Sequence, residues 1–205
     1  MKKQIKVMLA FAIVLSFAFT IPQIPVKPFR VIIDAGHGGR DYGAKTGQAT
    51  EKDITEAIAQ KIKLMNKDQN IEIYVTRNGD TFMDLKDRVQ FVNSLDANLL
   101  ISLHVSSDKD VASSGMGIYT YTDSSHYKES TAYANQLKNK LSENKNWQIA
   151  PIKEASFYIL KNVNTPALHL DLGYLSNAKD KAILSSTDGQ DEISNAILDY
   201  IQAIR

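Results

Sequence analysis

The stretch Val31–Gly39, VIIDAGHGG, is the segment around which we expect the rest of the chain to be organised. Its three consecutive apolar residues predict a short buried strand, and Asp34 then begins a glycine-rich turn that carries His37. Glycine adopts backbone angles that other residues avoid, and it leaves space beside the imidazole ring. Because His37 follows directly after a strand, we interpret it as a residue that contacts a ligand.

Strand and helix patterns alternate along the rest of the chain. Short apolar or alternating runs predict strands, and apolar residues at helical spacing predict helices. The further expected strands are 71–76, 98–105, 116–121, 157–160 and 167–172. The expected helices are 51–66, 84–95, 126–144, 177–184 and 191–204, the second with a core-facing stripe of Leu85, Val89 and Val92. This order predicts a single α/β domain built around a mostly parallel sheet.

The composition excludes several classes of protein. The chain has 205 residues, of which 43% are hydrophobic, so it can bury a core of its own. Its formal charge is +1 and it has no basic stripe, which argues against a nucleic-acid partner. It has no cysteine, which excludes disulfides, thiolate metal sites and a lipid-anchored cysteine.

The N-terminal segment has the pattern of an export signal. Three lysines precede an almost unbroken apolar run, Val7–Phe19. This run has the length of a signal-peptide core and is short for a membrane span of about 20 residues. We expect a signal peptide at 1–20, with an uncleaved anchor as the alternative, an extended linker at 21–29 and one domain at 30–205. The mature protein is expected to be exported to the periplasm, the cell envelope or the extracellular space.

Three more polar residues are expected to meet His37 at one edge of the sheet. In α/β sheets, ligands bind beyond the carboxyl ends of the strands. His104 and Asp171 lie near the ends of expected strands, and Glu51 lies in the first turn of the helix after the His37 loop. Two histidines, a carboxylate and an open position form a recurrent catalytic zinc site. A second carboxylate can pass a proton from water to a leaving nitrogen, so the set favours metal-assisted amide hydrolysis.

Each of these residues also has a purely structural explanation. Glu51 can complement the helix dipole, His104 can be a hydrogen-bonded core histidine, and Asp171 can cap the turn at Gly173. His169 shares a strand face with Asp171, where it either lines the site or packs in the core. The candidates do not form a local motif such as HExxH, so spacing alone leaves both explanations open.

Several segments in order carry a resemblance to a known family. They are VIIDAGHGGRDYGA at 31–44, EKD at 51–53, VTRNGD at 75–80, LKDRVQFVN at 85–93, LLISLHVSS at 99–107 and PALHLDLGYLSN at 166–177. Together they resemble the zinc-dependent N-acetylmuramoyl-L-alanine amidases, the amidase-3 family of cell-wall enzymes. The resemblance implies a mixed sheet of six strands flanked by helices, with one zinc ion held by His37, Glu51 and His104. It also implies cleavage of the amide bond between N-acetylmuramic acid and the L-alanine of peptidoglycan stem peptides, in cell-wall remodelling or daughter-cell separation.

The resemblance further implies a catalytic carboxylate in the last segment, and here the sequence departs from the family. The family usually has a glutamate before Leu-Gly, whereas this chain has Asp171 before Leu172 and Gly173. A displacement of about 1 Å can cost about a hundredfold in rate. Asp171 is thus either a working base or the mark of a weakened or silent zinc-containing peptidoglycan-binding protein. A zinc peptidase or deacetylase acting on another amide is a third interpretation.

A second departure concerns regulation. Some family members carry an insertion with a zinc-blocking helix after the strand that corresponds to 116–121. Here only 122–128 separates this strand from the next expected helix, so we predict no such helix and an open site. The expected partner is peptidoglycan, with no membrane span in the mature form, and a monomer is expected. Tyr158, Asn162 and Asn164 are candidates for the lining of the substrate groove.

Overall fold

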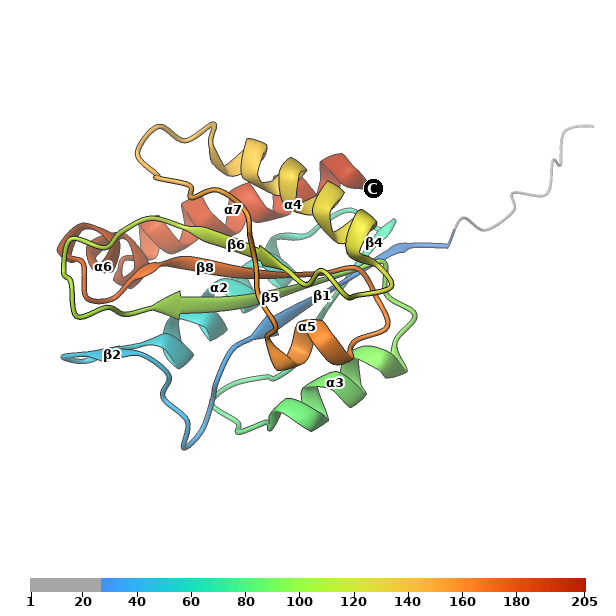
Figure 1. The fold of residues 1–205 in the computed structure, drawn as a ribbon, viewed down its shortest axis with the longest axis horizontal. Coiled ribbons are helices and arrows are strands. Elements are labelled where there is room, and N and C mark those ends of the chain that lie inside the picture. Colours follow the sequence, from blue (N-terminus) through green and yellow to red (C-terminus); the bar gives the residue numbers. More distant parts are fainter. Residues whose placement is uncertain (1–26) are drawn as a thin grey trace, which may run out of the picture.

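A six-stranded sheet forms the centre of the structure, a computed structural model that describes residues 27–205 (Figure 1). Its strands are β1 (Phe29–Ala35), β4 (Ile71–Val75), β5 (Leu99–Ser106), β6 (Gly117–Thr120), β7 (Lys153–Glu154) and β8 (Ala167–Tyr174). Their order is β4-β1-β5-β8-β6-β7, and only the β6–β8 pair of this sheet is antiparallel. The mixed, mostly parallel sheet of six strands is confirmed. The expected signal at 1–20 lies outside the described residues.

Helices cover both faces of this sheet. The apolar side chains of α2 (Glu51–Met65), α4 (Tyr127–Leu141), α6 (Ala178–Ser185) and α7 (Thr187–Ile204) join one core cluster. Those of α3 (Leu85–Ser94) and α5 (Tyr158–Asn162) join a second cluster on the opposite face, and Figure 1 shows these two helices together below the sheet. A small hairpin of β2 (Lys45–Thr46) and β3 (Ala49–Thr50) precedes α2. Among residues 27–205, no helix combines the length and apolar character needed to span a membrane.

Two sequence predictions are wrong. The run Phe157–Leu160 is not a strand, because the chain turns into α5 at Tyr158 and buries Ile159 and Leu160. A short apolar run fits a buried helix turn as well as a strand, so periodicity could not separate the two. Leu85 does not face the core and is 54% exposed, because it occupies the first turn of α3, next to a surface cavity.

The N-terminus of α2 places Glu51 where the sequence predicts it. The hydroxyl of Thr50 accepts a hydrogen bond from the backbone N–H of Asp53 at 3.3 Å, which caps the first turn. Glu51 is therefore the first helical residue, and its side chain is buried under the end of β5. The N-cap of α2 therefore fixes the position of a carboxylate that the candidate site requires.

The face of the sheet under α3 and α5 changes from apolar to polar toward the carboxyl ends of its central strands. Strand alternation and parallel register align side chains across β1, β5 and β8. The apolar row is Ile32, Leu100 and Ala167, and the next row toward the carboxyl end is Asp34, Ser102 and His169. One step further, His104 lies beside Asp171. The fold thus gathers the polar residues of three distant segments at one edge.

Candidate metal and active site

Three candidate ligands converge at this edge of the sheet. One donor atom from each of His37, Glu51 and His104 lies within 4.8 Å of the other two. Glu51 Oε1 is 3.1 Å from His37 Nε2 and 2.8 Å from His104 Nδ1. The loop after β1, the first turn of α2 and the end of β5 supply these side chains, so residues far apart in sequence form one cluster.

The carboxylate at the centre of this cluster is ionised. Burial alone would raise the pKa of Glu51, but hydrogen bonds with His104 and His37 bring it well below its usual range. The backbone N–H groups of Val105 and Ala44 donate to its two oxygens at 2.9 and 2.8 Å. An anionic oxygen, rigidly held and flanked by two imidazoles, is suited to a cation.

The backbone at His37 adopts a conformation that few non-glycine residues take. His37 has φ = 60°, which is in the left-handed region. Backbone hydrogen bonds between Gly38 and Asp41, at 2.9 and 3.1 Å, close the tight loop that follows. Such strain persists where surrounding contacts fix it, and it is concentrated at functional sites.

Asp41 orients the His37 ring. Its Oδ2 lies 2.8 Å from His37 Nδ1, which leaves Nε2 directed toward Glu51. Burial alone would lower the pKa of His37, but hydrogen bonds with Glu51 and then Asp41 raise it. A carboxylate on the outer nitrogen of a metal-binding histidine fixes the tautomer and ring direction.

Asp41→Ala should therefore weaken the binding of added zinc at this cluster by about 10- to 100-fold, because such outer partners typically contribute that much to metal affinity or activity. A competition titration against a chromophoric chelator measures this change. Asp41→Asn is the matched control, since its amide oxygen still accepts from His37 Nδ1. An unchanged zinc affinity in Asp41→Ala would show that Asp41 does not orient His37.

A buried ion pair fixes the end of β1 beneath the His37 loop. Arg88 of α3 donates to Asp34 Oδ1 at 2.7 Å and to the Ala35 carbonyl at 2.6 Å, and it also donates to the His37 carbonyl. Ser102 donates to the other oxygen of Asp34 at 2.6 Å. Burial alone would raise the pKa of Asp34, but Arg88 and then Ser102 lower it. The pair is thus satisfied, and it ties α3 to the loop.

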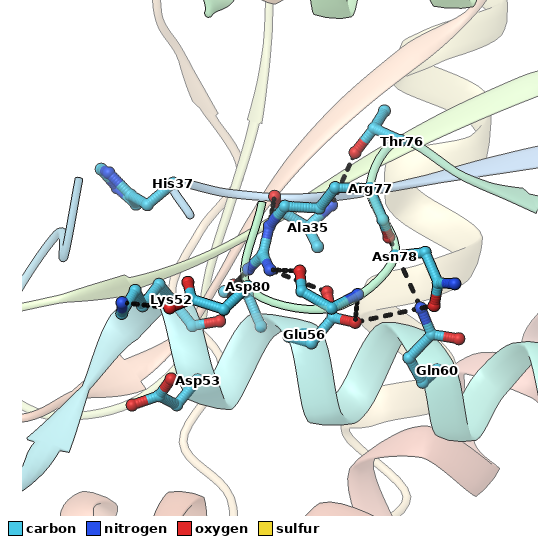
Figure 2. Close-up of polar contacts among 12 residues, drawn as sticks. Ala35, His37, Lys52, Asp53, Glu56, Gln60, Thr76, Arg77, Asn78 and Asp80 are labelled. Carbon is cyan, nitrogen blue, oxygen red and sulfur yellow. Dashed lines mark hydrogen bonds and ion pairs between the residues drawn. The ribbon is translucent and has the colours of Figure 1, made fainter. Parts of the chain in front are cut away.

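A second buried arginine ties the loop to α2, as Figure 2 shows. Arg77 donates to the carbonyls of Ala35 at 3.1 Å, Gly36 at 3.2 Å and Lys52 at 2.7 Å. It also pairs with Glu56 at 2.8 Å. One guanidinium thereby joins β1, the His37 loop and the first turns of α2.

Lys52 and Asp80 support the next part of the loop (Figure 2). Lys52 Nζ donates to the Gly39 carbonyl at 2.8 Å and to Asp80 Oδ2 at 2.7 Å. Asp80 Oδ1 in turn accepts from the Gly39 N–H at 2.7 Å. The backbone of Gly39 is therefore held by two charged side chains, Lys52 at its carbonyl and Asp80 at its N–H.

Asp171 lies next to the ligand cluster as the register partner of His104. Its oxygens accept from His169 Nε2 at 3.0 Å and from the Ser106 hydroxyl at 2.8 Å. Burial alone would raise the pKa of Asp171, but the hydrogen bond from His169 leads the effects that lower it below its usual range. Burial and then the charge of Asp171 raise the pKa of Tyr119 to about 12. Asp171 is thus an ionised, buried carboxylate beside the cluster.

A cavity of about 530 Å³ opens beside the cluster. Its walls include His37 and His104, together with apolar side chains of Phe82, Leu85 and Tyr158. Of the three candidates for the lining of the substrate groove, Tyr158 lines this cavity. Asn162 and Asn164 instead bond to Asn93 of α3 and lie outside the lining of this cavity.

The donor set fits a zinc ion. Zinc takes neutral imidazole nitrogens and carboxylate oxygens, usually in a tetrahedron with one open position at catalytic sites. Donors at about 2.0–2.2 Å from the ion lie roughly 3.3–3.6 Å apart in that geometry. The contacts of Glu51 with the two histidines, at 3.1 and 2.8 Å, need only small side-chain shifts to reach it.

The sequence predicts the members of this site but not their supports. His37, Glu51 and His104 meet as expected, and Asp171 lies beside them. The sequence alone indicates no role for Arg77 or Arg88. Both arginines lie in segments that carry the family resemblance, VTRNGD and LKDRVQFVN, and this was the available signal. Their role depends on contacts between distant segments, which spacing does not reveal.

Comparisons with known proteins agree with this geometry. A family model described as N-acetylmuramoyl-L-alanine amidase matches residues 31–203. The uncharacterized protein YqiI of Bacillus subtilis is 30% identical over 180 residues, covering 87% of this chain and 86% of YqiI. The N-acetylmuramoyl-L-alanine amidase LytC of the same organism is 30% identical over 176 residues, covering 85% of this chain and 35% of LytC.

A solved structure extends the similarity to three dimensions. The catalytic domain of CwlV, an N-acetylmuramoyl-L-alanine amidase from Bacillus (Paenibacillus) polymyxa, superposes with a TM-score of 0.78 at 33% identity. The match covers 86% of this chain and 97% of that domain. The fold described above is therefore that of an amidase catalytic domain.

Proposed function

The chain belongs to the N-acetylmuramoyl-L-alanine amidase family, and from this premise we propose that it is an exported zinc hydrolase acting on peptidoglycan. Its reaction is hydrolysis of the amide bond between N-acetylmuramic acid and the L-alanine of the stem peptide, in cell-wall remodelling or daughter-cell separation. The observation that carries the proposal is the convergence of His37, Glu51 and His104 beside Asp171 within the matched region.

The proposed roles follow from the chemistry of these side chains. His37, Glu51 and His104 hold the zinc ion, with the His37 ring oriented by Asp41. When bound, zinc supplies a water with a pKa lowered to about 7 and polarises the amide carbonyl. Asp171 accepts the proton of the attacking water and gives it to the leaving nitrogen. The products are a lactyl carboxylate and a stem peptide with a free L-alanine amino group.

The cavity supports an accessible substrate site. Between the end of β6 and the start of α4, only residues 121–126 connect the two elements. Within residues 27–205, the cavity beside His37 and His104 has a volume of about 530 Å³ and is lined on one side by the first turn of α3. We place the muramyl peptide in this cavity, with its scissile amide toward the three ligands.

Export is part of the proposal because the substrate lies outside the cytoplasmic membrane. The supporting feature is the sequence of residues 1–20, with its lysines and the apolar run Val7–Phe19. A fusion of residues 1–29 to a reporter enzyme that is active only after export tests this part separately.

A silent peptidoglycan-binding protein is the second candidate, and the short side chain of Asp171 is the observation that favours it. Both candidates predict binding of zinc and of sacculi. They differ in the products, because only the amidase releases material from the wall.

Product analysis tests the proposed function. Purified sacculi are incubated with the zinc-loaded protein, and soluble products are identified by mass spectrometry after labelling of free amino groups. The proposal predicts intact stem peptides with labelled L-alanine at their N-termini. Cuts inside the peptide would indicate a peptidase, released acetate a deacetylase, and bound protein without products the silent candidate.

A further inference from the structure

His169 is a buried histidine that takes no part in the proposed reaction steps but contacts two residues that do. It is 6% exposed and lies on β8 between Ser102 of β5 and Tyr119 of β6, its register partners. Its Nε2 is 3.0 Å from Asp171 Oδ1. A carboxylate only accepts hydrogen bonds, so Nε2 carries the hydrogen and donates it to Asp171.

The ring of His169 is fixed on both of its faces. On one face it stacks on His104, with ring centroids 4.4 Å apart and an interplanar angle of 14°. On the other it stacks on Phe157, at 4.2 Å and 28°. The Tyr119 ring meets it edge-on at 5.5 Å. Such packing leaves the ring little freedom to rotate, so Nε2 keeps its direction.

One side chain therefore contacts both a metal ligand and the proposed base. The His169 ring touches His104, and its Nε2 holds Asp171. Ser106 holds the second oxygen of Asp171 at 2.8 Å but comes from beyond a register irregularity in β5. Only His169, among the hydrogen-bond partners of Asp171 in residues 27–205, also stacks on a ligand of the cluster.

From this geometry we infer that His169 is a positioning residue that sets the Asp171 carboxylate relative to the metal ligands. The inference rests on the proposed function. A short acid has fewer torsions than a longer one, so its carboxylate depends on the backbone and on its partners for position. A misplacement of about 1 Å at a reacting group can cost about a hundredfold in rate. His169 restricts rotation of the Asp171 side chain by holding one of its oxygens, and it contacts the ligand His104 at the same time.

The kinetic test compares variants that differ in the hydrogen bond to Asp171. His169→Leu should lower kcat for stem-peptide release by about 10- to 100-fold, with KM changed less than about threefold. His169→Gln should restore most of kcat, since its amide N–H can donate to Asp171. His126→Leu is the matched control, because the His126 side chain makes no hydrogen bond within residues 27–205, and its kcat should be unchanged.

A double-mutant cycle tests whether His169 acts through Asp171. Adding His169→Leu to Asp171→Asn should cause no further loss of kcat, because residues that act as a unit are not additive. An equal loss with and without the carboxylate would overturn the inference, as would a His169→Gln variant no better than His169→Leu. Each variant is first checked for its thermal unfolding midpoint and for one bound zinc ion.

A readout that is independent of activity separates this inference from the proposed function. In the metal-free protein, long-range proton–nitrogen NMR correlations should show His169 in its Nε2–H tautomer with a downfield-shifted, slowly exchanging Nε2 proton, and Asp171→Ala should remove that shift and that protection from exchange. An Nδ1–H tautomer in the wild type would overturn the positioning role. An inactive wild type with the Nε2–H tautomer intact would instead contradict the proposed hydrolysis while leaving the contact established.

Discussion

The Asp171→Asn variant should release stem peptides with a kcat about 10²- to 10⁴-fold below that of the wild type, because an amide cannot accept the proton that a carboxylate accepts. The hydrogen bonds of the native side chain lower the pKa of Asp171 despite its burial, so the wild-type group is an available base at neutral pH. Steady-state release from soluble muramyl peptides measures the change.

The substitution is chosen so that the fold survives it. Asparagine has the shape of aspartate, its oxygen can accept from His169, and its amide can donate to the Ser106 oxygen. Zinc stoichiometry and the thermal midpoint should therefore match the wild type. An Asp171→Asn variant with wild-type kcat would show that another group is the base.

Asp171→Glu addresses the length of the acid. The resemblance implies a glutamate at this position in most of the family, and Asp171 is one methylene shorter. An active wild type with an inactive asparagine variant makes Asp171 the working base. A silent wild type with an active Asp171→Glu variant would support the silent binding protein instead.

Arg88→Met should destabilise the fold by about 3–5 kcal/mol at neutral pH, because removing one partner of a buried ion pair leaves the other charge uncompensated. Asp34 and Arg88 are 1% and 3% exposed, and their atoms are 2.7 Å apart. The guanidinium also donates to the carbonyls of Ala35 and His37, so the loop loses these bonds as well. Denaturant unfolding monitored at Trp147 measures the loss.

The pH dependence of this effect identifies its cause. In the wild type, Arg88 lowers the folded-state pKa of Asp34, so the pair's contribution is complete above the unfolded value of about 3.9 and is lost as the pH falls through the folded pKa. Without Arg88, the folded-state pKa of Asp34 should rise, because the largest effect that lowers it is removed while its burial remains. The destabilisation should then shrink as the pH falls and Asp34 is protonated.

Lys86→Met is the matched control for this experiment. Lys86 is an exposed residue of the same helix, so its replacement should leave the unfolding midpoint unchanged. A loss of stability in Arg88→Met that is the same at acidic and neutral pH would contradict the role of the Asp34 charge.

The sequence predicts the layered fold well because its signals are local. The Thr50 cap, the helical spacing after Glu51 and the apolar run of β5 each act within one element, and each is found in the structure. The predictions fail where a local pattern fits two structures. The run at Phe157–Leu160 is too short to distinguish a strand from a turn of helix. In the structure it enters α5, which buries Ile159 and Leu160.

The sequence predicts the members of the site and their meeting at one edge of the sheet, but not the contacts that hold them in place. His37, Glu51 and His104 were identified from residue type, strand ends and the family resemblance, and they converge. The contact of His169 with Asp171 depends on the register of β8 and on the packing of Phe157. Strand register depends on the packing of the whole sheet, so it cannot be recognised from local patterns in the sequence.

Release of stem peptides from sacculi, measured as zinc is titrated into the metal-free protein, tests directly whether this chain is a zinc amidase. We predict that release rises with added zinc and saturates at one equivalent. His37→Ala should release none at any zinc concentration that saturates the wild type. Full release without metal, or one tightly bound zinc ion with no release, would contradict the claim that this chain is a zinc amidase.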